Sequence, residues 1–154
     1  MITFEAATDL EIVRTLFREY AKTLPIALDF QGFEDELASL PGKYAAPDGC
    51  LVIARVEGNV AACIALRRFD AQTGEIKRLY VRPTYRGRGL AKQLTVRMLE
   101  EATRIGYERV VLDTLRSMTP AVSLYRSMGF QEIEAYYPNP FDAVYFEKQL
   151  KTPR

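Results

Sequence analysis

The chain has 154 residues, of which 48% are hydrophobic and 27% are charged, and its net charge at neutral pH is +1. This length and composition predict one globular domain and exclude a disordered or fibrous protein. The sequence contains no histidine, which excludes serine–histidine nucleophiles, HExxH zinc sites and imidazole proton transfer. Any acid–base chemistry must therefore use Asp, Glu, Tyr, Lys, Cys, water or the backbone.

Two cysteines, Cys50 and Cys63, lie in apolar segments, and their spacing matches neither a CxxC motif nor a zinc site. We expect both thiols to be reduced and mostly buried, and we expect no metal centre. The N-terminal residues lack the basic start and apolar run of a signal peptide, and no apolar stretch approaches the ~20 residues that span a bilayer. The protein is therefore expected to be cytoplasmic and to bind no membrane.

The charges nearly cancel, but they are unevenly distributed along the chain. Residues 77–104 contain eight basic and two acidic side chains, whereas residues 29–48 contain five acidic side chains and one basic side chain. Such segregation occurs on solvated faces, and it marks a binding site when a motif lies within it. The small net charge disfavours a nucleic-acid partner.

The chain begins with a predicted strand over residues 2–4, which is followed by a helix. Thr8 and Glu11 match a capping box, in which each side chain accepts a hydrogen bond from the backbone N–H of the other residue. Apolar residues then repeat at helical spacing, and the helix is predicted to end before Pro25. A shorter helix is predicted over residues 33–40.

The middle of the chain predicts an antiparallel meander and a long helix. Apolar runs separated by short turns indicate strands over residues 51–56, 60–66 and 75–81. A regular apolar stripe then indicates a helix over residues 90–105, which Gly106 ends.

The last third of the chain alternates between strands and one helix. A strand is predicted over residues 109–113, and a proline at the first helical position opens a helix over residues 119–128. Two further strands are predicted over residues 130–133 and 143–150. The element order indicates a single domain with a mixed α/β sheet. An exposed final strand would allow pairing between subunits, so a monomer and a homodimer both stay open.

The loop before the long helix carries the main chemical signal. Gly87 and Gly89 remove side chains that would obstruct a ligand, and the helix that follows points its free N–H groups into the loop. Arg86, Arg88 and Lys92 add positive charge, so the segment suits a phosphate or pyrophosphate. A solvated basic turn is the alternative. Lys92 stands where a dinucleotide-binding GxGxxG motif needs its third glycine.

The pattern Arg86-x-x-Gly89-x-Ala91 resembles the acetyl-CoA loop of the GCN5-related N-acetyltransferase (GNAT) family, and residues 121–130 resemble a later motif of the same family. The chain most resembles a bacterial subgroup of undefined substrate. The resemblance implies a single GNAT domain over residues 1–154 with a mixed, mostly antiparallel sheet of about six to seven strands. This sheet would be flanked by about four helices and splayed at the acetyl-CoA strand.

The resemblance also implies acetyl-CoA as co-substrate and assigns residues to it. The pantetheine arm would pair with the backbone of the strand before the loop, and the pyrophosphate would bind the loop amides. Met118 departs from the family pattern, which often has a cofactor-contacting asparagine at this position. The residues implied for the cofactor are Leu79, Tyr80, Val81, Arg86, Gly87, Arg88, Gly89, Leu90, Ala91 and Lys92.

Two residues are implied for catalysis. Tyr125 corresponds to the tyrosine that donates a proton to the leaving thiolate in this family, and its alternative role is packing against the sheet. Glu75 corresponds to the glutamate base of histone-type members. Its alternatives are an ion pair with Lys77 or Arg78 and deprotonation of the amine through water.

The implied reaction moves an acetyl group to the primary amine of a small molecule or peptide by direct attack in a ternary complex. Tyr136 and Tyr137 either line the acceptor pocket or pack in the core. The acidic residues within 29–48 either attract a basic acceptor or form the acidic first turn of a helix. Alternatives to the whole assignment are a longer acyl donor, an O-linked acceptor, and a non-catalytic acetyl-CoA sensor or partner protein.

Overall fold

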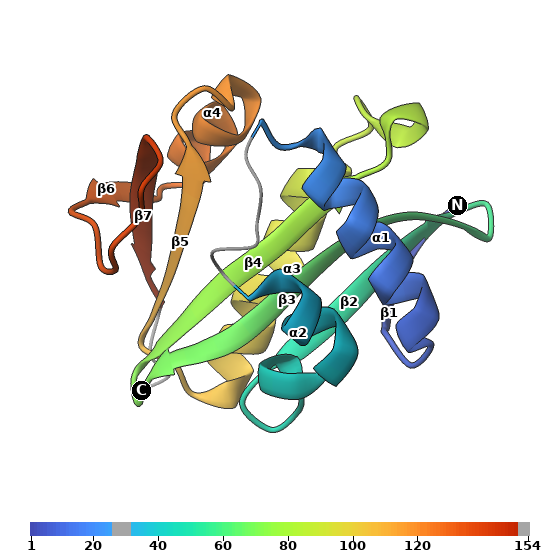
Figure 1. The fold of residues 1–154 in the computed structure, drawn as a ribbon, viewed down its shortest axis with the longest axis horizontal. Helices are drawn as coiled ribbons and strands as arrows, with labels where there is room; N and C mark the ends of the chain where they lie inside the picture. The colour runs from blue at the N-terminus through green and yellow to red at the C-terminus, as the bar shows by residue number, and fades with distance from the viewer. Residues whose placement is uncertain (26–31, 151–154) are drawn as a thin grey trace.

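The computed structural model describes residues 1–25 and 32–150, in which seven strands form one sheet in the order β1-β2-β3-β4-β5-β7-β6 (Figure 1). The strands are β1 (Ile2–Ala6), β2 (Cys50–Val56), β3 (Asn59–Asp70), β4 (Thr73–Val81), β5 (Arg109–Leu115), β6 (Gln131–Ile133) and β7 (Ala143–Gln149). The helices are α1 (Leu10–Thr23), α2 (Phe33–Ser39), α3 (Leu90–Ile105) and α4 (Thr119–Ser127), with short 3₁₀ turns η2 (Gly42–Tyr44) and η3 (Pro83–Tyr85). This arrangement confirms the expected fold class.

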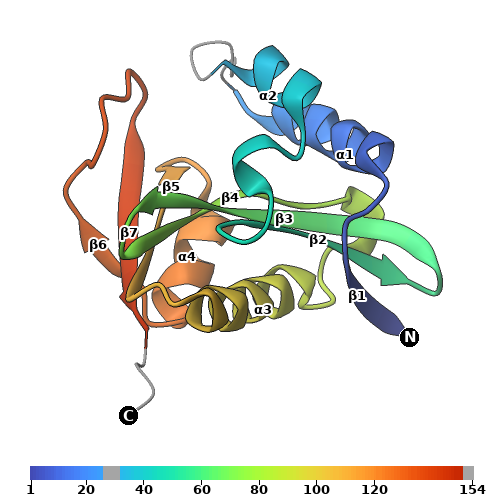
Figure 2. The same cartoon turned by 90° about the horizontal axis from the view of Figure 1, so that it is seen from below.

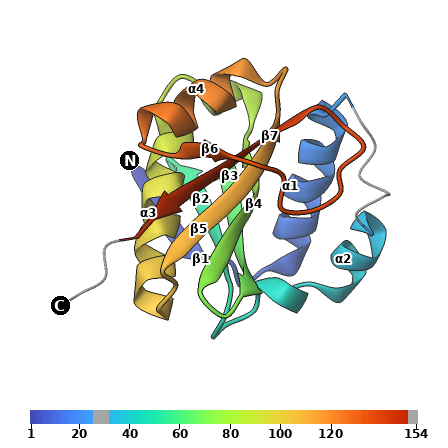
Figure 3. The ribbon, with the colours of Figure 1, turned by 90° about the vertical axis from the view of Figure 1, so that its left-hand side faces the viewer.

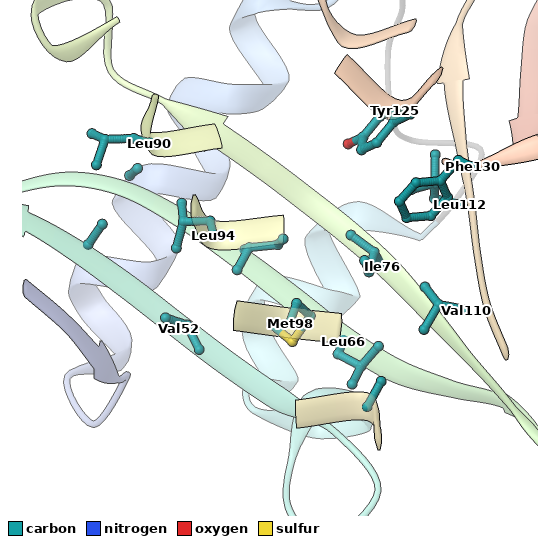
Figure 4. Close-up of a cluster of buried hydrophobic side chains, with 14 of the residues drawn as sticks. Val52, Leu66, Ile76, Leu90, Leu94, Met98, Val110, Leu112, Tyr125 and Phe130 are labelled. Carbon is teal, nitrogen blue, oxygen red and sulfur yellow. The ribbon is translucent and has the colours of Figure 1, made fainter. Parts of the chain in front are cut away.

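The helices cover the sheet in pairs, with α1 and α2 on one face and α3 and α4 on the other (Figure 2). On the second face, α3 packs through Leu90, Leu94 and Met98, which are spaced four residues apart and are at most 2% exposed. These side chains lie against Leu66 and Ile76 of the sheet (Figure 4). The apolar spacing in the sequence predicts this stripe, and the structure confirms it.

The feature that matters for function is the junction of β4 and β5. All other neighbouring strands in the sheet are antiparallel, but these two are parallel and pair only over Thr73–Glu75 and Arg109–Val111. Beyond Glu75 the strands diverge, as Figure 1 shows, so the edge of β4 that faces β5 keeps backbone N–H and C=O groups unpaired with that strand. The expected splay of the sheet at this strand is therefore present.

A bulge in β4 accompanies this divergence. The register between β3 and β4 shifts between Cys63 and Ala65, and Arg78 adopts a φ of 61°. A positive φ is unfavourable for a side chain of this size, so other contacts must hold it. Two hydrogen bonds of 3.0 Å from Arg78 to the Glu36 carboxylate on α2 do so.

Two local expectations are wrong. The N-cap of α1 is Asp9, whose Oδ1 accepts from the Glu11 N–H at 3.0 Å, and not Thr8 of the supposed capping box. The last long strand, β7, is not exposed at an edge, because it lies between β5 and β6 (Figure 3). The short strand β6 forms that edge instead, so the reason given for pairing through the final strand disappears.

Candidate active site

A cavity of about 100 Å³ lies where β4 and β5 separate. Its lining comes from elements that are distant in the sequence: Tyr20 from α1, Lys77 from β4, Asp113 from β5, Tyr125 from α4 and Asn139 from the loop before β7. The divergence of the strands is therefore what leaves room for this cavity in the sheet.

Tyr125 has a packing role and also faces the cavity. Its side chain is 5% exposed, and its ring makes edge contacts with Phe130 at 5.4 Å and a tilted contact with Phe146 at 6.1 Å between centroids. Figure 4 shows its hydroxyl pointing toward β4 and away from Phe130. Burial raises the pKa of Tyr125 well above the ordinary tyrosine value of 10.0. The hydroxyl is therefore fully protonated at neutral pH and is available as a donor.

The glycine-containing loop forms an open N-terminus for α3. Gly87 and Gly89 have φ values of 81° and 76°, and a Cβ atom at Gly87 would meet nothing within 4 Å. No side chain caps the helix at Gly89, and the Gln93 N–H donates to the Gly89 carbonyl at 3.1 Å. The backbone N–H groups in the first turn of α3, before Gln93, have no carbonyl partner within the helix and point out of its end. They and the helix dipole stabilise an anion at this position.

The basic residues of this loop lie on the surface around that helix end. Arg86, Arg88 and Lys92 are exposed. Arg86 Nε donates to the Val81 carbonyl at 3.1 Å, which ties the loop to the end of β4, and the Arg88 guanidinium lies 5.6 Å from the centroid of the Tyr85 ring. The cations thus surround the free amides, and this donor set fits a polyphosphate.

The remaining residues assigned to the cofactor present mainly backbone. Leu79, Tyr80 and Val81 form the part of β4 that lies beyond its pairing with β5. The side chain of Tyr80 turns to the α1 face, where its hydroxyl donates to Glu19 at 3.1 Å. Leu90 is 2% exposed in the core. Leu90 and Ala91, which follows it, therefore offer their amides at the first turn of α3.

Glu75 does not line the cavity, and its carboxylate is already engaged. The side chain is 1% exposed, and its Oε1 accepts from Arg67 Nε at 2.8 Å while its Oε2 accepts from the Tyr136 hydroxyl at 2.7 Å. The ion pair that the sequence left open is therefore made with Arg67 instead of Lys77 or Arg78.

Tyr136 and Tyr137 support the carboxylates next to the cavity. Their rings belong to an aromatic cluster with Phe69 and Tyr145, with centroid distances of 5.0 to 5.7 Å. While Tyr136 donates to Glu75, the Tyr137 hydroxyl donates to Asp113 Oδ2 at 2.6 Å. Neither tyrosine is among the described residues that line the cavity. Both residues thus pack and also orient acidic groups.

Lys77, Arg78, Asp113 and Asn139 line the cavity but were not assigned to the site from the sequence. The available signal was the pair of basic residues Lys77 and Arg78 between the apolar residues of a predicted strand, and Asp113 directly after the apolar run 110–112. A charge in or next to such an apolar run is unusual, because a charge that becomes buried needs a partner.

The acidic residues expected to attract a basic acceptor are mostly paired within the protein. Glu34 pairs with Arg18, Glu36 pairs with Arg78, and Asp48 pairs with Arg68. Asp29 lies outside the described residues. Because these carboxylates are paired, the acidic segment offers little negative charge to a ligand.

The thiols are separate from this chemistry. Both cysteines are free, and burial raises the pKa of the Cys63 thiol to about 12. Its thiolate is negligible at neutral pH, which disfavours a covalent cysteine intermediate. Within residues 1–25 and 32–150, no helix is long and apolar enough to span a membrane, and no cluster of three acidic or cysteine side chains could hold a metal.

Comparisons with known proteins agree with this geometry. The model of the acetyltransferase (GNAT) family matches residues 11–130. An uncharacterised N-acetyltransferase of Schizosaccharomyces pombe is 40% identical over 140 residues, which cover 90% of this chain and 86% of that protein. A GNAT-family acetyltransferase structure from Staphylococcus aureus matches with a TM-score of 0.82 at 20% identity and covers 98% and 100% of the two chains. The structure of yncA from Salmonella typhimurium, solved with its cofactor acetyl-CoA, matches with a TM-score of 0.71 at 20% identity over 97% and 94%.

Proposed function

Because this chain belongs to the acetyltransferase (GNAT) family and is an acyltransferase, we propose that it transfers an acetyl group from acetyl-CoA to a primary amine of a small molecule or peptide. The observation that carries the proposal is the separation of β4 from β5, with the open N-terminus of α3 at one side and the Tyr125 hydroxyl facing the gap.

The residues around α3 fit the coenzyme. The free amides from Gly87 to Ala91 would hold the pyrophosphate, with Arg86, Arg88 and Lys92 beside it as counter-charges. The β4 backbone over residues 79–81 would pair with the amides of the pantetheine arm.

The thioester of acetyl-CoA supplies an activated acyl group, so no protein nucleophile is required. The proposed role of the cavity is to hold the acceptor amine close to the acetyl carbon. As the new C–N bond forms and the C–S bond breaks, Tyr125 donates its proton to the departing sulfur, and the amine loses a proton in turn. Tyr125 carries that proton at neutral pH, because burial raises the pKa of its hydroxyl.

The second catalytic role is that of the base, which takes the proton that the amine loses. Glu75 is our candidate base, and its contact with the Tyr136 hydroxyl at 2.7 Å lets that hydroxyl pass a proton to its carboxylate. Because neither residue is among the described residues that line the cavity, water would carry the proton from the amine to this pair. Glu75→Gln and Tyr136→Phe should then both lower kcat, because each interrupts the same route. If Tyr136→Phe keeps the wild-type kcat, the proton leaves without passing through this pair.

Two measurements test the proposed function. Calorimetry should detect acetyl-CoA binding that weakens in an Arg86→Ala/Arg88→Ala variant, with Arg18→Ala as a control because Arg18 is exposed and lies on α1. Release of the CoA thiol should then occur with members of a panel of primary amines. Binding without thiol release by any amine would favour the non-catalytic sensor, and the absence of binding would contradict both functions.

A further inference from the structure

Lys77 is a buried cation without a partner inside the cavity. Its side chain is on β4, lines the cavity and is 9% exposed. Among the described residues, it makes no hydrogen bond and has no carboxylate within 4.0 Å, and its ammonium group is not completely sealed from solvent. Burying a charge in this way is costly unless a partner compensates for it.

The nearby carboxylates are occupied. Both oxygens of Glu75 accept hydrogen bonds, one from Arg67 and one from Tyr136. Both oxygens of Glu36 accept from Arg78 at 3.0 Å. In each pair the carboxylate and the guanidinium neutralise each other, so neither carboxylate compensates the positive charge of Lys77.

Asp113 is the opposite case on the facing strand. It lines the same cavity and accepts a hydrogen bond from Tyr137 at 2.6 Å, but no cation within the described part of the chain pairs with it. Its charge reaches Lys77 only at long range, because the two are not within ion-pair distance. The cavity therefore contains one unmatched cation and one unmatched anion that do not neutralise each other directly.

We propose that the acceptor is a small aminocarboxylic acid, whose carboxylate pairs with Lys77 and whose amino group lies beside Asp113. This inference rests on the proposed function, and it adds the chemical class of the acceptor. A molecule that carries both charges compensates the buried Lys77 and the half-buried Asp113 at once. A carboxylate-free polyamine would leave Lys77 unmatched and would bring further positive charge next to it.

The physical setting strengthens the pair. Burial lowers the pKa of Lys77, and a bound carboxylate would favour its charged form again. Because water is largely excluded from the side chain, the interaction is stronger than that of an exposed lysine. We expect a carboxylate to increase affinity by about 10-fold or more over an uncharged amide of the same shape.

Equilibrium binding tests this inference without relying on turnover. The protein saturated with CoA is titrated with N-acetyl amino acids and with the matching N-acetyl amino-acid amides, which differ only in the carboxylate. The wild type should prefer at least one acid over its amide by about 10-fold or more. Lys77→Met should reduce this ratio to near one, Lys77→Arg should keep most of it, and Lys22→Met, at the exposed end of α1, should leave it unchanged.

Each other result contradicts the inference. It fails if no acid binds, if the amides bind as tightly as the acids, or if Lys77→Met keeps the preference. If Lys77→Met does not fold, the ratio of acid to amide in the wild type still decides. Failure of the proposed function has a different result, namely no thiol release from acetyl-CoA with any amine.

Discussion

The two faces of the sheet bury different kinds of side chain. The face under α3 and α4 is apolar, with residues such as Leu66, Ile76 and Met98 at or below 4% exposure. The face under α1 and α2 also has an apolar cluster, but it buries charged residues of β4 as well, among them Glu75 and Lys77. The first face stabilises the fold, and the second places charges beside the cavity at a cost in stability.

Tyr125 connects the two faces. Its ring packs in the cluster of the apolar face, while its hydroxyl lies in the gap that leads to the charged face. We therefore expect substitutions on the apolar face to change mainly stability and those on the charged face to change mainly function. In Tyr125, the ring should contribute to stability and the hydroxyl to catalysis.

The largest effect should follow from Tyr125→Phe. The ring contacts with Phe130 and Phe146 stay, and only the proton donor is lost. We expect kcat to fall by about 100-fold or more while the dissociation constant of acetyl-CoA changes little. Steady-state kinetics and calorimetry on the same preparation measure both quantities. An unchanged kcat would remove the proposed acid and reduce Tyr125 to a packing residue.

Met98→Ala should produce the next largest effect, and it should be one of stability alone. Met98 is completely buried between α3 and the sheet, so truncation loses apolar burial and leaves a cavity. The free energy of unfolding should decrease by about 2–5 kcal/mol. Denaturant unfolding measures this loss, and the KM of the folded variant should match the wild type. A changed KM would break the division between the two faces.

On the charged face the same kind of substitution should act in the opposite direction. Lys77→Met replaces an unpaired buried cation by an apolar side chain of similar length, and we expect the free energy of unfolding to rise by about 1 kcal/mol at neutral pH. Because burial lowers the pKa of Lys77 below 10.5, the folded state carries the cost of the charge at neutral pH and loses it as the pH rises toward 10.5. Unfolding curves at increasing pH should show the gain over wild type shrinking.

If the gain from Lys77→Met were constant over that range, the charge of Lys77 would not be its source. A loss of stability would show that Lys77 contributes through packing, and the contrast between the faces would then be one of composition only. The charge-conserving Lys77→Arg variant is the control for volume.

The apolar face could be predicted from the sequence because its information is local. The spacing of Leu90, Leu94 and Met98 defines the buried side of α3 without knowledge of any partner. The charged face could not be predicted in this way. Lys77 and Asp113 come from strands whose separation depends on a bulge, on pairing that stops at Glu75, and on contacts across the whole domain.

The candidate site was predictable where it consists of a continuous motif. The glycine loop and α3 follow each other directly, so the open helix end could be expected from residues 86–92 alone. The partner of Glu75 could not be found among its sequence neighbours, because Arg67 lies opposite it on β3 and Tyr136 lies in a distant loop. Hydrogen bonds across strands decide such pairings, and they require the register.

The smallest effect concerns the helix that covers the charged face. Asp9 Oδ1 accepts from the Glu11 N–H at 3.0 Å. Asp9→Ala removes this acceptor, leaves the Glu11 N–H without its side-chain partner at the start of α1, and should lower the free energy of unfolding by about 1 kcal/mol. Thr8→Ala is the matched control, because Thr8 precedes the cap and should contribute only a few tenths of that loss. Denaturant unfolding of both variants measures the difference. The reverse order would restore the capping box of the sequence pattern, whereas the expected order shows that a single neighbouring carboxylate outcompetes the threonine for the same end of the helix.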